Sequence, residues 1–404
     1  MSVAVQSRPT SSFATKPLGE VFDVVGGGTP PKNNASYFGG DIPWATIRDM
    51  HSDVLAQTEH TISEEGLRNS SAKLIPAGEV IMASRVGLGK ACILQHDTAI
   101  NQDIRALLPL KPSTVDRRFC LYWLQSVKDD IIAAGTGATV QGIKLPFIKS
   151  LPFPDVAFEE QKRIVAVLDQ AFAALDRALA LAEANLADAE ELFDGWLTAV
   201  FHDHPAEWAT RKLRDLCHQI TVGHVGPMAD RYTSAGTPFL RSQNVRPFRI
   251  DLGDVKFIDD AFRSELKKSE LRPGDVAIVR TGYPGTAAVI PDDLPLANCA
   301  DLVIARPKDE LHPEFLAMFL NSSFGKKMVA EKSVGAAQKH FNVGAAKEVD
   351  FAYPGLEDQR TIVNQMKAMR GHSARLYDQC QAKIDELQEL RQALLRQAFA
   401  GELT

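Results

Sequence analysis

The sequence predicts an α+β protein in which one unit occurs twice: a globular module followed by a long helix, then a second module and a second helix. Landmarks in residues 16–157 recur in the same order in residues 205–354. Each module is followed by a stretch with helical periodicity, at 158–204 and 355–404. The 404 residues also exceed the length of most single domains. Residues 1–15 form a polar N-terminal tail before the first module.

Matching turns and strands predict that the two modules share one framework. The paired segments are Ile42-Pro-Trp with Thr237-Pro-Phe, Ile75-Pro-Ala-Gly-Glu-Val with Arg272-Pro-Gly-Asp-Val, Gly89-Lys-Ala with Gly285-Thr-Ala, and Asn101 with Asn298. Each Pro-Gly turn leads into β-branched and apolar residues, which is typical of a strand. One helix is expected in each module, at 115–134 and at 313–332.

The two long helices align without gaps at an offset of 198 residues, and identical residues include Gln161/Gln359 and Phe201/Phe399. Apolar residues at alternating spacings of three and four predict a coiled-coil seam. The predicted seam residues are Leu168, Leu175, Leu179, Leu186 and Phe193 in the first helix, and Met366, Tyr377, Ile384, Leu387 and Leu394 in the second. Because residues 202–209 are too few to return along the first helix, an antiparallel pair with internal pseudo-two-fold symmetry is favoured.

Composition favours a cytoplasmic protein without a membrane span, since the N-terminus has no apolar signal and no run of about 18 apolar residues occurs. The net charge of -6 arises mainly in residues 158–204, which hold 3 Lys+Arg and 10 Asp+Glu. Both modules are close to neutral, so charge alone neither supports nor excludes nucleic acid. Five cysteines without a Cys-x-x-Cys pair are expected to be reduced and buried.

Motifs of catalysis are missing from the sequence. The Gly26-Gly-Gly-Thr-Pro stretch lacks the Gly-Lys-Ser/Thr of a P-loop, and Gly135-Thr-Gly lacks the third glycine of a dinucleotide fingerprint. His202-Asp-His has no third metal ligand in view. There is also no Asn-Pro-Pro-Tyr/Phe, the motif that positions a flipped adenine in amino-methyltransferases. We therefore expect a binding or scaffolding role, with no catalytic, cofactor or metal site.

The ordered landmarks resemble the specificity subunit of type I restriction–modification systems. The residues that carry the resemblance are Gly27-Gly-Thr-Pro-Pro-Lys, Tyr37-Phe-Gly-Gly-Asp-Ile-Pro-Trp, Gly89-Lys-Ala, Asn101-Gln, Glu160-Gln-Lys-Arg-Ile-Val and the closing helix from Leu387. The resemblance covers residues 16–403. The second module departs from it, having Gly223-His-Val-Gly-Pro in place of the Gly-Gly-Thr-Pro loop.

This resemblance implies a non-enzymatic subunit with two target recognition domains, each reading one half of an asymmetric, bipartite site in double-stranded DNA. The helices would set the gap between the half-sites. They would also dock two methyltransferase subunits and the restriction/translocase subunits. S-adenosylmethionine, ATP and Mg would bind those partners and not this chain.

Side chains that suit DNA contacts lie in or beside the matched loops. Arginine reads guanine, asparagine and glutamine read adenine, and lysine mostly contacts phosphate. The candidates are Lys32, Asn33, Asn34, Arg48, Arg85, Lys90, Gln102 and Lys144 in the first module, and Arg241, Gln243, Asn244, Arg280, Thr281, Tyr283, Gln338 and Lys339 in the second. Asn101 and Asn298 are flanked by apolar residues, so a structural turn and a base contact both fit them.

Two other functions fit the sequence. One is a stand-alone DNA-binding regulator that uses the same modules without catalytic partners. The other is a coiled-coil scaffold that never touches DNA. A neighbouring gene encoding Asn-Pro-Pro-Tyr/Phe would favour the restriction–modification interpretation, and its absence would favour the regulator. A scaffold would show no salt-dependent DNA binding in the reconstituted complex.

Overall fold

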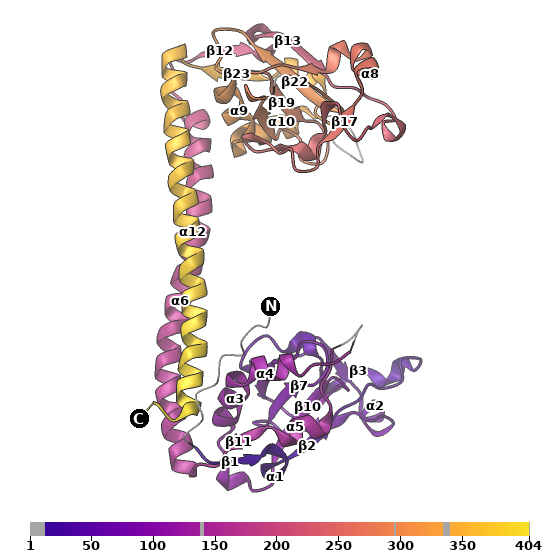
Figure 1. Cartoon of the computed structure of the whole chain (residues 1–404), viewed down its shortest axis with the longest axis vertical. Helices are drawn as coiled ribbons and strands as arrows, with labels where there is room; N and C mark the ends of the chain where they lie inside the picture. The colour runs from indigo at the N-terminus through magenta and orange to yellow at the C-terminus, as the bar shows by residue number, and fades with distance from the viewer. Residues whose placement is uncertain (1–12, 138–140, 295, 334–339, 404) are drawn as a thin grey trace. The chain divides into compact units, whose positions relative to one another are not determined.

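The computed structural model describes residues 13–137, 141–294, 296–333 and 340–403. It divides into two compact units, coloured by residue number in Figure 1. Unit 1 is Met1–Ala182 with Ala382–Thr404, and unit 2 is Glu183–Gln381. Two helices of 45 residues, α6 (Phe158–His202) and α12 (Leu356–Ala400), contribute a segment to each unit. Each unit is therefore one module with a helix pair attached.

The module of unit 1 is built on two sheets. Its elements are β1 (Thr15–Pro17), α1 (Leu18–Val21), β2 (Phe22–Gly26), β3 (Phe38–Ala45), β4 (Val54–Leu55), β5 (His60–Ile62), α2 (Glu64–Arg68), β6 (Lys73–Ile75), β7 (Val80–Ala83), β8 (Ala91–Leu94), β9 (Thr98–Ile100), β10 (Ile104–Pro109), α3 (Arg117–Ser126), α4 (Lys128–Ala133), α5 (Leu145–Ser150) and β11 (Pro152–Pro154). One sheet has the order β2-β10-β7-β8-β4 and the other β5-β3-β9-β6. Strand β1 pairs with β11 and joins the two ends of the module.

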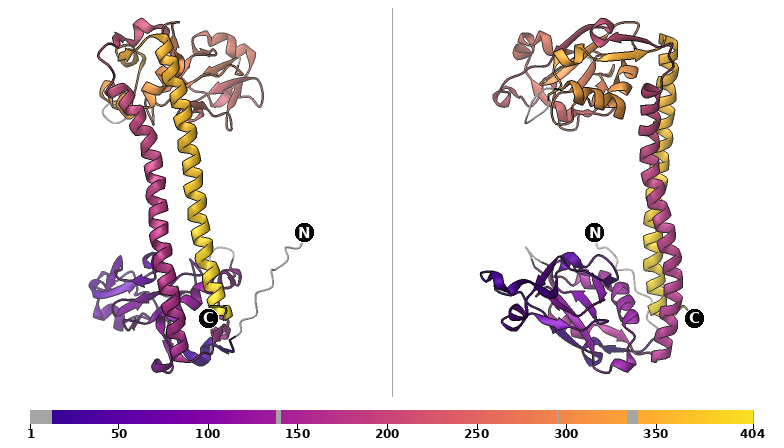
Figure 2. Two further views of the ribbon diagram at one scale, coloured as in Figure 1. Left: turned by 90° about the vertical axis from the view of Figure 1, so that its left-hand side faces the viewer. Right: turned by 180° about the vertical axis from the view of Figure 1, so that it is seen from behind.

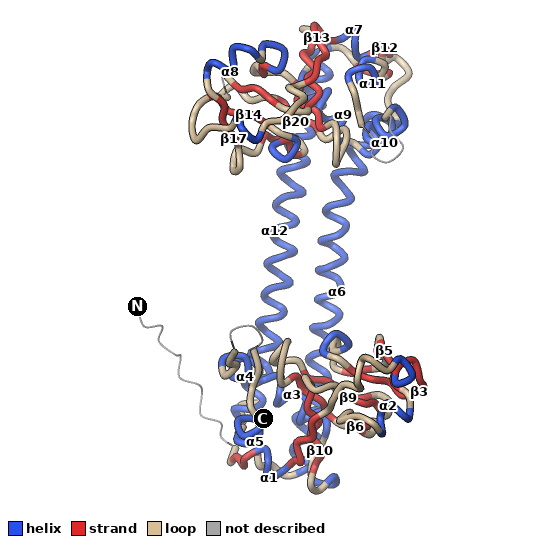
Figure 3. The backbone as a smooth tube through the Cα atoms, turned by 90° about the vertical axis from the view of Figure 1, so that its right-hand side faces the viewer, coloured by secondary structure: helices blue, strands red, loops and turns tan. Residues whose placement is uncertain are grey.

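The module of unit 2 repeats this topology. Its elements are β12 (Ala209–Lys212), α7 (Leu213–Leu216), β13 (Cys217–Val222), β14 (Thr237–Leu240), β15 (Val245–Arg246), β16 (Arg249–Ile250), β17 (Lys256–Ile258), α8 (Asp260–Glu265), β18 (Glu270–Leu271), β19 (Val276–Val279), β20 (Ala287–Val289), β21 (Ala297–Cys299), β22 (Leu302–Pro307), α9 (Pro313–Asn321), α10 (Ser323–Lys332), α11 (Val343–Lys347) and β23 (Asp350–Tyr353). Its sheets run β13-β22-β19-β20, with four strands where unit 1 has five, and β17-β14-β21-β18; β15 pairs with β16 separately, and β12 pairs with β23. Figure 3 shows these strands in red in both units. The α+β fold predicted from the sequence, with its duplicated module, is confirmed.

Strand register corrects one landmark of the repeat. Trp44 on β3 pairs with Ala99, and the equivalent Phe239 on β14 pairs with Asn298. Asn298 therefore corresponds to Ala99 and not to Asn101, so the predicted pairing of the two asparagines was wrong. The connection from β21 to β22 is one residue shorter than that from β9 to β10, which hid the true register.

The single helix expected in each module is two helices. In unit 1, α3 and α4 are separated at Val127, and in unit 2, α9 and α10 are separated at Ser322. Ser322 has an extended backbone, and its hydroxyl accepts a hydrogen bond from Gly325 N–H at 3.0 Å. Serine at this position caps a new helix, which explains the break. The apolar periodicity continues through the break, so the break could not be predicted from the sequence.

Helices α6 and α12 pack side by side within each unit (Figure 2). In unit 1, Arg391 Nη1 lies 2.7 Å from Asp176 Oδ1, and its guanidinium carbon lies 4.1 Å from the ring centroid of Phe172. In unit 2, the Ser373 hydroxyl donates to the carbonyl of Ala189 at 2.8 Å. Because α6 runs from unit 1 into unit 2 and α12 runs back, the paired segments are antiparallel, as predicted.

Burial of the predicted seam residues varies along the helices. Leu168, Met366, Ile384 and Leu387 are buried, whereas Leu175, Leu179, Leu186, Phe193 and Leu394 are half-buried. Tyr377 is 40% exposed. At the ends of α6 and α12 the most buried leucines are Leu197 and Leu395, both with at most 1% exposed. Leu197 packs into the core of the module of unit 2, and Leu395 packs into the core of the module of unit 1. The buried positions there are displaced by one residue from the predicted coiled-coil register.

A buried glutamine at the start of each long helix ties that helix to its module. Gln161 is 2% exposed and Gln359 is fully buried. Each side chain accepts one backbone N–H and donates to two carbonyls, at 2.8–3.0 Å. The partners are Asp116, Thr114 and Val156 in unit 1, and His312, Glu310 and Pro354 in unit 2. Both copies therefore use the same polar joint, which satisfies the otherwise unpaired backbone groups.

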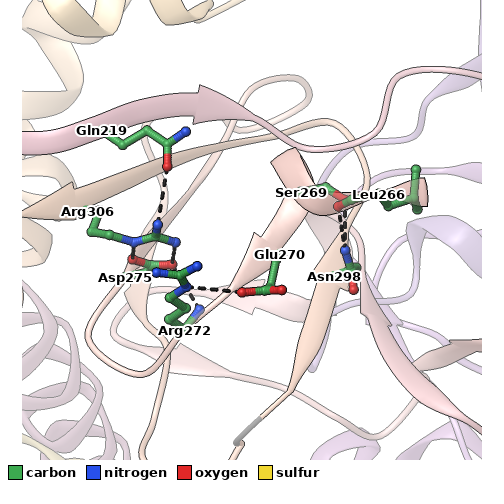
Figure 4. A network of polar contacts seen from close by, with 8 residues as sticks. All are labelled: Gln219, Leu266, Ser269, Glu270, Arg272, Asp275, Asn298 and Arg306. Atoms are coloured by element: carbon green, nitrogen blue, oxygen red, sulfur yellow. Dashed lines mark hydrogen bonds and ion pairs between the residues drawn. The ribbon is translucent and has the colours of Figure 1, made fainter. Parts of the chain in front are cut away.

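The turns that precede β7 and β19 each pair a carboxylate with an arginine, and the carboxylate of unit 2 is buried. Asp275 is 1% exposed, accepts from Arg272 N–H at 2.9 Å and forms two hydrogen bonds with the Arg306 guanidinium at 2.7 and 2.8 Å (Figure 4). In unit 1, Glu79 forms a similar pair with Arg117 at 2.9 and 3.2 Å. Through the Arg272 N–H, Asp275 holds the backbone of the turn that precedes β19, whereas in unit 1 Asp97 accepts the Ala77 N–H of the turn that precedes β7 at 2.8 Å.

All five cysteines are buried and unbonded, as expected. Burial raises the pKa of Cys92 and Cys217 to about 12, so neither thiol is a nucleophile near neutral pH. Within the described residues, no helix combines the length and apolar character needed to cross a membrane. The same residues contain no group of three or more His, Cys, Asp or Glu that could hold a metal ion.

Candidate nucleic-acid interface

The glycine-rich loop of each module is fixed by a close approach to the last residue of β9 or β21. A Cβ on Gly27 would lie 2.0 Å from the carbonyl oxygen of Ile100, and one on Gly223 would lie 2.6 Å from that of Cys299. Only glycine fits such contacts. The next residues, Gly28 and His224, donate their N–H to these same carbonyls at 3.0 and 2.8 Å. The Gly223-His-Val-Gly-Pro loop of the second module therefore occupies the place that the Gly-Gly-Thr-Pro loop has in the first.

In unit 1, the glycine-rich loop, the β7–β8 turn and the β9–β10 connection meet around Asp103. Arg85 Nη1 lies 3.7 Å from Asp103 Oδ1, and Gln102 donates to Asp103 Oδ2 at 3.2 Å. The Thr29 hydroxyl donates to the side-chain oxygen of Gln102. Three sequence-distant loops thus present polar side chains together at one end of the sheet.

Unit 2 builds the same convergence around Asp301. Arg280 Nη1 lies 2.7 Å from Asp301 Oδ1, and the Thr281 hydroxyl contacts His340 Nδ1 at 2.9 Å. Asp301 has a φ of 50°, a conformation that aspartate tolerates better than most residues. Asp103 and Asp301 occupy equivalent positions in the two modules. Arg85 and Arg280 occupy neighbouring, not equivalent, positions of the β7–β8 and β19–β20 turns. The backbones of the two modules therefore match at this place, whereas the side chains that they carry differ.

A short 3-10 turn beside β3 and β14 carries the remaining central candidates. In unit 1, Arg48 lies exposed in Ile47–Asp49, and Lys90 Nζ reaches the Ile47 carbonyl at 3.4 Å. In unit 2, Arg241 and Gln243 both bind the carboxylate of Asp254, at 3.1 and 2.7 Å. The hydrogen bond from Arg241 is the main cause that holds the pKa of Asp254 below its usual range.

Several predicted DNA contacts are exposed beside these loops. Lys32, Asn33, Arg48, Arg85, Lys90, Gln102 and Lys144 are exposed in unit 1, as are Gln243 and Tyr283 in unit 2. Lys144 follows Ile143, whose N–H donates to Ser84 at the base of the β7–β8 turn at 2.9 Å. Asn34 is half-buried, and its side-chain oxygen caps the turn Ala35–Tyr37. Gln338 and Lys339 lie outside the described residues.

Three of the predicted residues are occupied by structural contacts. Asn244 is 2% exposed, and its amide bonds the backbone of Arg241 and Asp251 at 3.0 and 2.9 Å, so it cannot reach a base. The Arg241 and Arg280 side chains are only 22% and 20% exposed and are paired with carboxylates. An asparagine that closes a loop looks the same in sequence as one that reads adenine.

Asn101 and Asn298 are structural. Asn101 is 6% exposed, and its side chain accepts from Asp103 N–H at 3.0 Å. Asn298 is 1% exposed and donates to Leu266 O and Ser269 Oγ at 3.0 Å each. Of the two interpretations left open for these residues, the turn and not the base contact fits.

Sequence reasoning missed His340 and the loop before Ile143. The N–H groups of Ile143 and Phe341 donate to equivalent residues, Ser84 and Arg280, at 2.9 and 3.1 Å. These positions are separated by 198 residues, the same offset that aligned the helices. Extending that offset back into the modules could have found the loop.

Comparison with known proteins shows which proteins this chain resembles. Residues 10–182 match the type I restriction modification DNA specificity domain. The MjaIX type I specificity subunit of Methanocaldococcus jannaschii is 24% identical over 66% of this chain and 66% of its own length. The EcoR124I/EcoR124II specificity subunit of Escherichia coli is 33% identical over 38% of this chain and 40% of its own length. The chain thus spans less than two thirds of either relative.

A solved structure shares the fold over nearly the full length. A chain of "Structural basis underlying complex assembly and conformational transition of the type I R-M system" superposes with a TM-score of 0.77 at 21% identity, covering 97% of this chain and 98% of that one. This chain is therefore similar to the specificity subunits of type I restriction–modification systems in its first module and in the named relatives, and the solved structure shares its fold.

Proposed function

We propose that this chain is the non-catalytic DNA-recognition subunit of a type I restriction–modification enzyme. Each module reads one half of a bipartite site in double-stranded DNA. The observation that carries the proposal is the convergence of the same three loops around Asp103 and Asp301, with exposed polar and cationic side chains beside them. Such side chains on a rigid strand framework suit contacts with phosphates and base edges.

The two half-sites should differ. At equivalent places in the β-turns the modules carry Arg85 and Thr281, and the adjoining 3-10 turns carry Arg48 and Gln243. Arginine favours guanine and glutamine favours adenine, so matched frames with different side chains would read different bases. A symmetric site would require the same side chains in both modules.

The long helices would set the gap between the half-sites and dock the partner subunits. Both modules hold their helix through the same buried glutamine joint, so each helix start is fixed in the same way. An internal pseudo-two-fold would let two identical methyltransferase subunits bind equivalent surfaces. S-adenosylmethionine, ATP and Mg would belong to the methyltransferase and restriction subunits.

Mapping methylated bases in host DNA, with and without this gene, tests the proposal. We expect a two-part, asymmetric motif with a fixed gap that disappears on deletion. A regulator that acts without partners would leave methylation unchanged, as would a scaffold that never touches DNA. Either that outcome or a continuous palindromic motif would overturn the proposal.

A further inference from the structure

The β7–β8 and β19–β20 turns are equivalent residue by residue. Met82 pairs with Ala91 and Ile278 pairs with Ala287, so no residue is inserted or lost between them. The backbone bonds agree as well, since Lys90 N–H donates to Gly87 O and Thr286 N–H donates to Tyr283 O, both at 3.2 Å. The two tips can therefore be compared position by position.

Both tips expose an apolar side chain to solvent. Tyr283 is 84% exposed in unit 2, and Val86 is 50% exposed in unit 1, one position earlier in the turn. Val86 also has a φ of 51°, which a β-branched residue rarely adopts. A strained, exposed valine gains nothing from burial in the fold, and backbone strain of this kind concentrates at functional positions.

The turn that carries Tyr283 is firmly anchored at its base. Arg280 is paired with Asp301 at 2.7 Å. The first residue of β20, Ala287, is bonded through both backbone groups to the buried side chain of Asn321, at 2.8 and 3.2 Å. Gly285, with a φ of 92°, lies so close to Val329 that an added Cβ would be 3.2 Å from it. The tyrosine thus projects from a pre-organised support, which limits the entropy lost on binding.

The surroundings of the tip are those of the proposed DNA-reading face. Val225, 64% exposed on the glycine-rich loop, directly follows His224, whose carbonyl accepts the Asp301 N–H at 3.0 Å. The polar side chains joined to Asp301, directly or through Thr281, are those of Arg280, Thr281 and His340. That mixture matches proteins that hold phosphates with cations and insert an apolar wedge between base pairs.

We propose that Tyr283 and Val86 are wedges, one in each module, that insert between neighbouring base pairs of their half-sites. Tyr283 stacks its ring on a base, and Val86 supplies a smaller aliphatic wedge. Neither residue reads a base edge by hydrogen bonding. The inference rests on the proposed function and adds to it a mode of recognition that depends on how easily a base step unstacks.

Affinity measurements on the complex with its methyltransferase subunits test the wedge. Stacking on an aromatic side chain contributes about 1–3 kcal/mol per base, so Tyr283→Ala should weaken binding by roughly 5- to 150-fold. Tyr283→Phe should bind like the wild type because it keeps the ring. Leu110→Ala is the matched control, since Leu110 is 57% exposed but follows the opposite end of β10 from Asp103.

The results separate this inference from the proposed function. If the wild-type complex shows no salt-dependent binding to its methylated motif, the proposed function itself fails. If it binds and Tyr283→Ala binds equally well, only the wedge fails. A loss with Tyr283→Phe equal to that with Tyr283→Ala would show that the hydroxyl acts, which also overturns the wedge.

A probe of base stacking gives an independent readout. 2-Aminopurine is placed at successive steps of each half-site, away from the methylated base. We expect its fluorescence to rise at one step per half-site on binding by the wild-type complex. Tyr283→Ala should abolish the rise in one half-site and Val86→Ala in the other. No rise at any step, or loss of both signals in either variant, would contradict the proposal.

Discussion

At the residue scale, the central turn of unit 2 depends on one buried ion pair. Asp275 is 1% exposed and bonds both the Arg306 guanidinium and the Arg272 N–H. Removing the carboxylate leaves Arg306 unpaired beside the core, where its side chain is only 23% exposed. Removing one partner of a buried ion pair strongly destabilises a fold, because the other charge stays buried without compensation. Replacing both partners by apolar residues costs much less.

We therefore expect Asp275→Ala to lower the free energy of unfolding by about 3–5 kcal/mol. Thermal unfolding of the full chain measures the change. Glu270→Ala is the control, because Glu270 pairs with Arg272 at the surface, where a salt bridge contributes at most about 1 kcal/mol. Equal effects of the two substitutions would show that burial of the pair does not determine its importance.

The placement of the candidate DNA-contacting side chains was only partly predictable from sequence. Residue type correctly located exposed cations such as Arg48 and Lys90 in loops. It could not separate Asn244, which closes a turn with both ends of its amide, from an asparagine free to read a base. The difference lies in burial and backbone geometry, which a single residue letter does not carry.

At the element scale, α6 and α12 carry different residues at equivalent interface positions. At an offset of 198, Phe172 corresponds to Arg370 and Phe193 to Arg391. In unit 1, Arg391 stacks over Phe172. In unit 2, Phe193 and Arg370 both pack on the ring of Phe248, at 6.0 and 4.7 Å. Each unit thus combines a phenylalanine of α6 with an arginine of α12.

This arrangement favours pairing of α6 with α12 over pairing of α12 with itself, which would place two arginines together. We expect Phe172→Arg to destabilise the full chain by about 3–5 kcal/mol, since a buried ring is lost and two cations meet. Adding Arg391→Phe should recover about 1–2 kcal/mol through the exchanged pair. Chemical denaturation measures both. Additive losses would show that the two residues do not interact.

The long helices were the elements that sequence predicted best. The predicted spans, 158–204 and 355–404, came from sustained apolar spacing and a constant offset, and they contain the observed helices Phe158–His202 and Leu356–Ala400. Inside the modules, the α3–α4 and α9–α10 breaks were not predicted. Val127 and Ser322 depart from helical backbone conformation, but the apolar pattern continues across them. Local backbone geometry, not hydrophobicity, ends those helices.

At the scale of the whole molecule, the duplication was visible in sequence, and most landmark pairs inside the modules, such as Gly89 with Gly285, hold, whereas the pair Asn101 and Asn298 does not. The helices keep a single offset because an insertion would rotate every following side chain out of the interface. Connections between strands tolerate length changes, and the shorter β21–β22 connection displaced the match between Asn101 and Asn298. A rigid element preserves register, and a loop does not.

The central claim is that the modules read their half-sites independently while the helices fix the gap. The most direct measurement is the methylation motif made in cells after residues 16–157 are replaced by the corresponding module of a related subunit with a different specificity. We predict that one half of the motif changes while the other half and the gap stay the same. A change in both halves, or in the gap, would contradict the account.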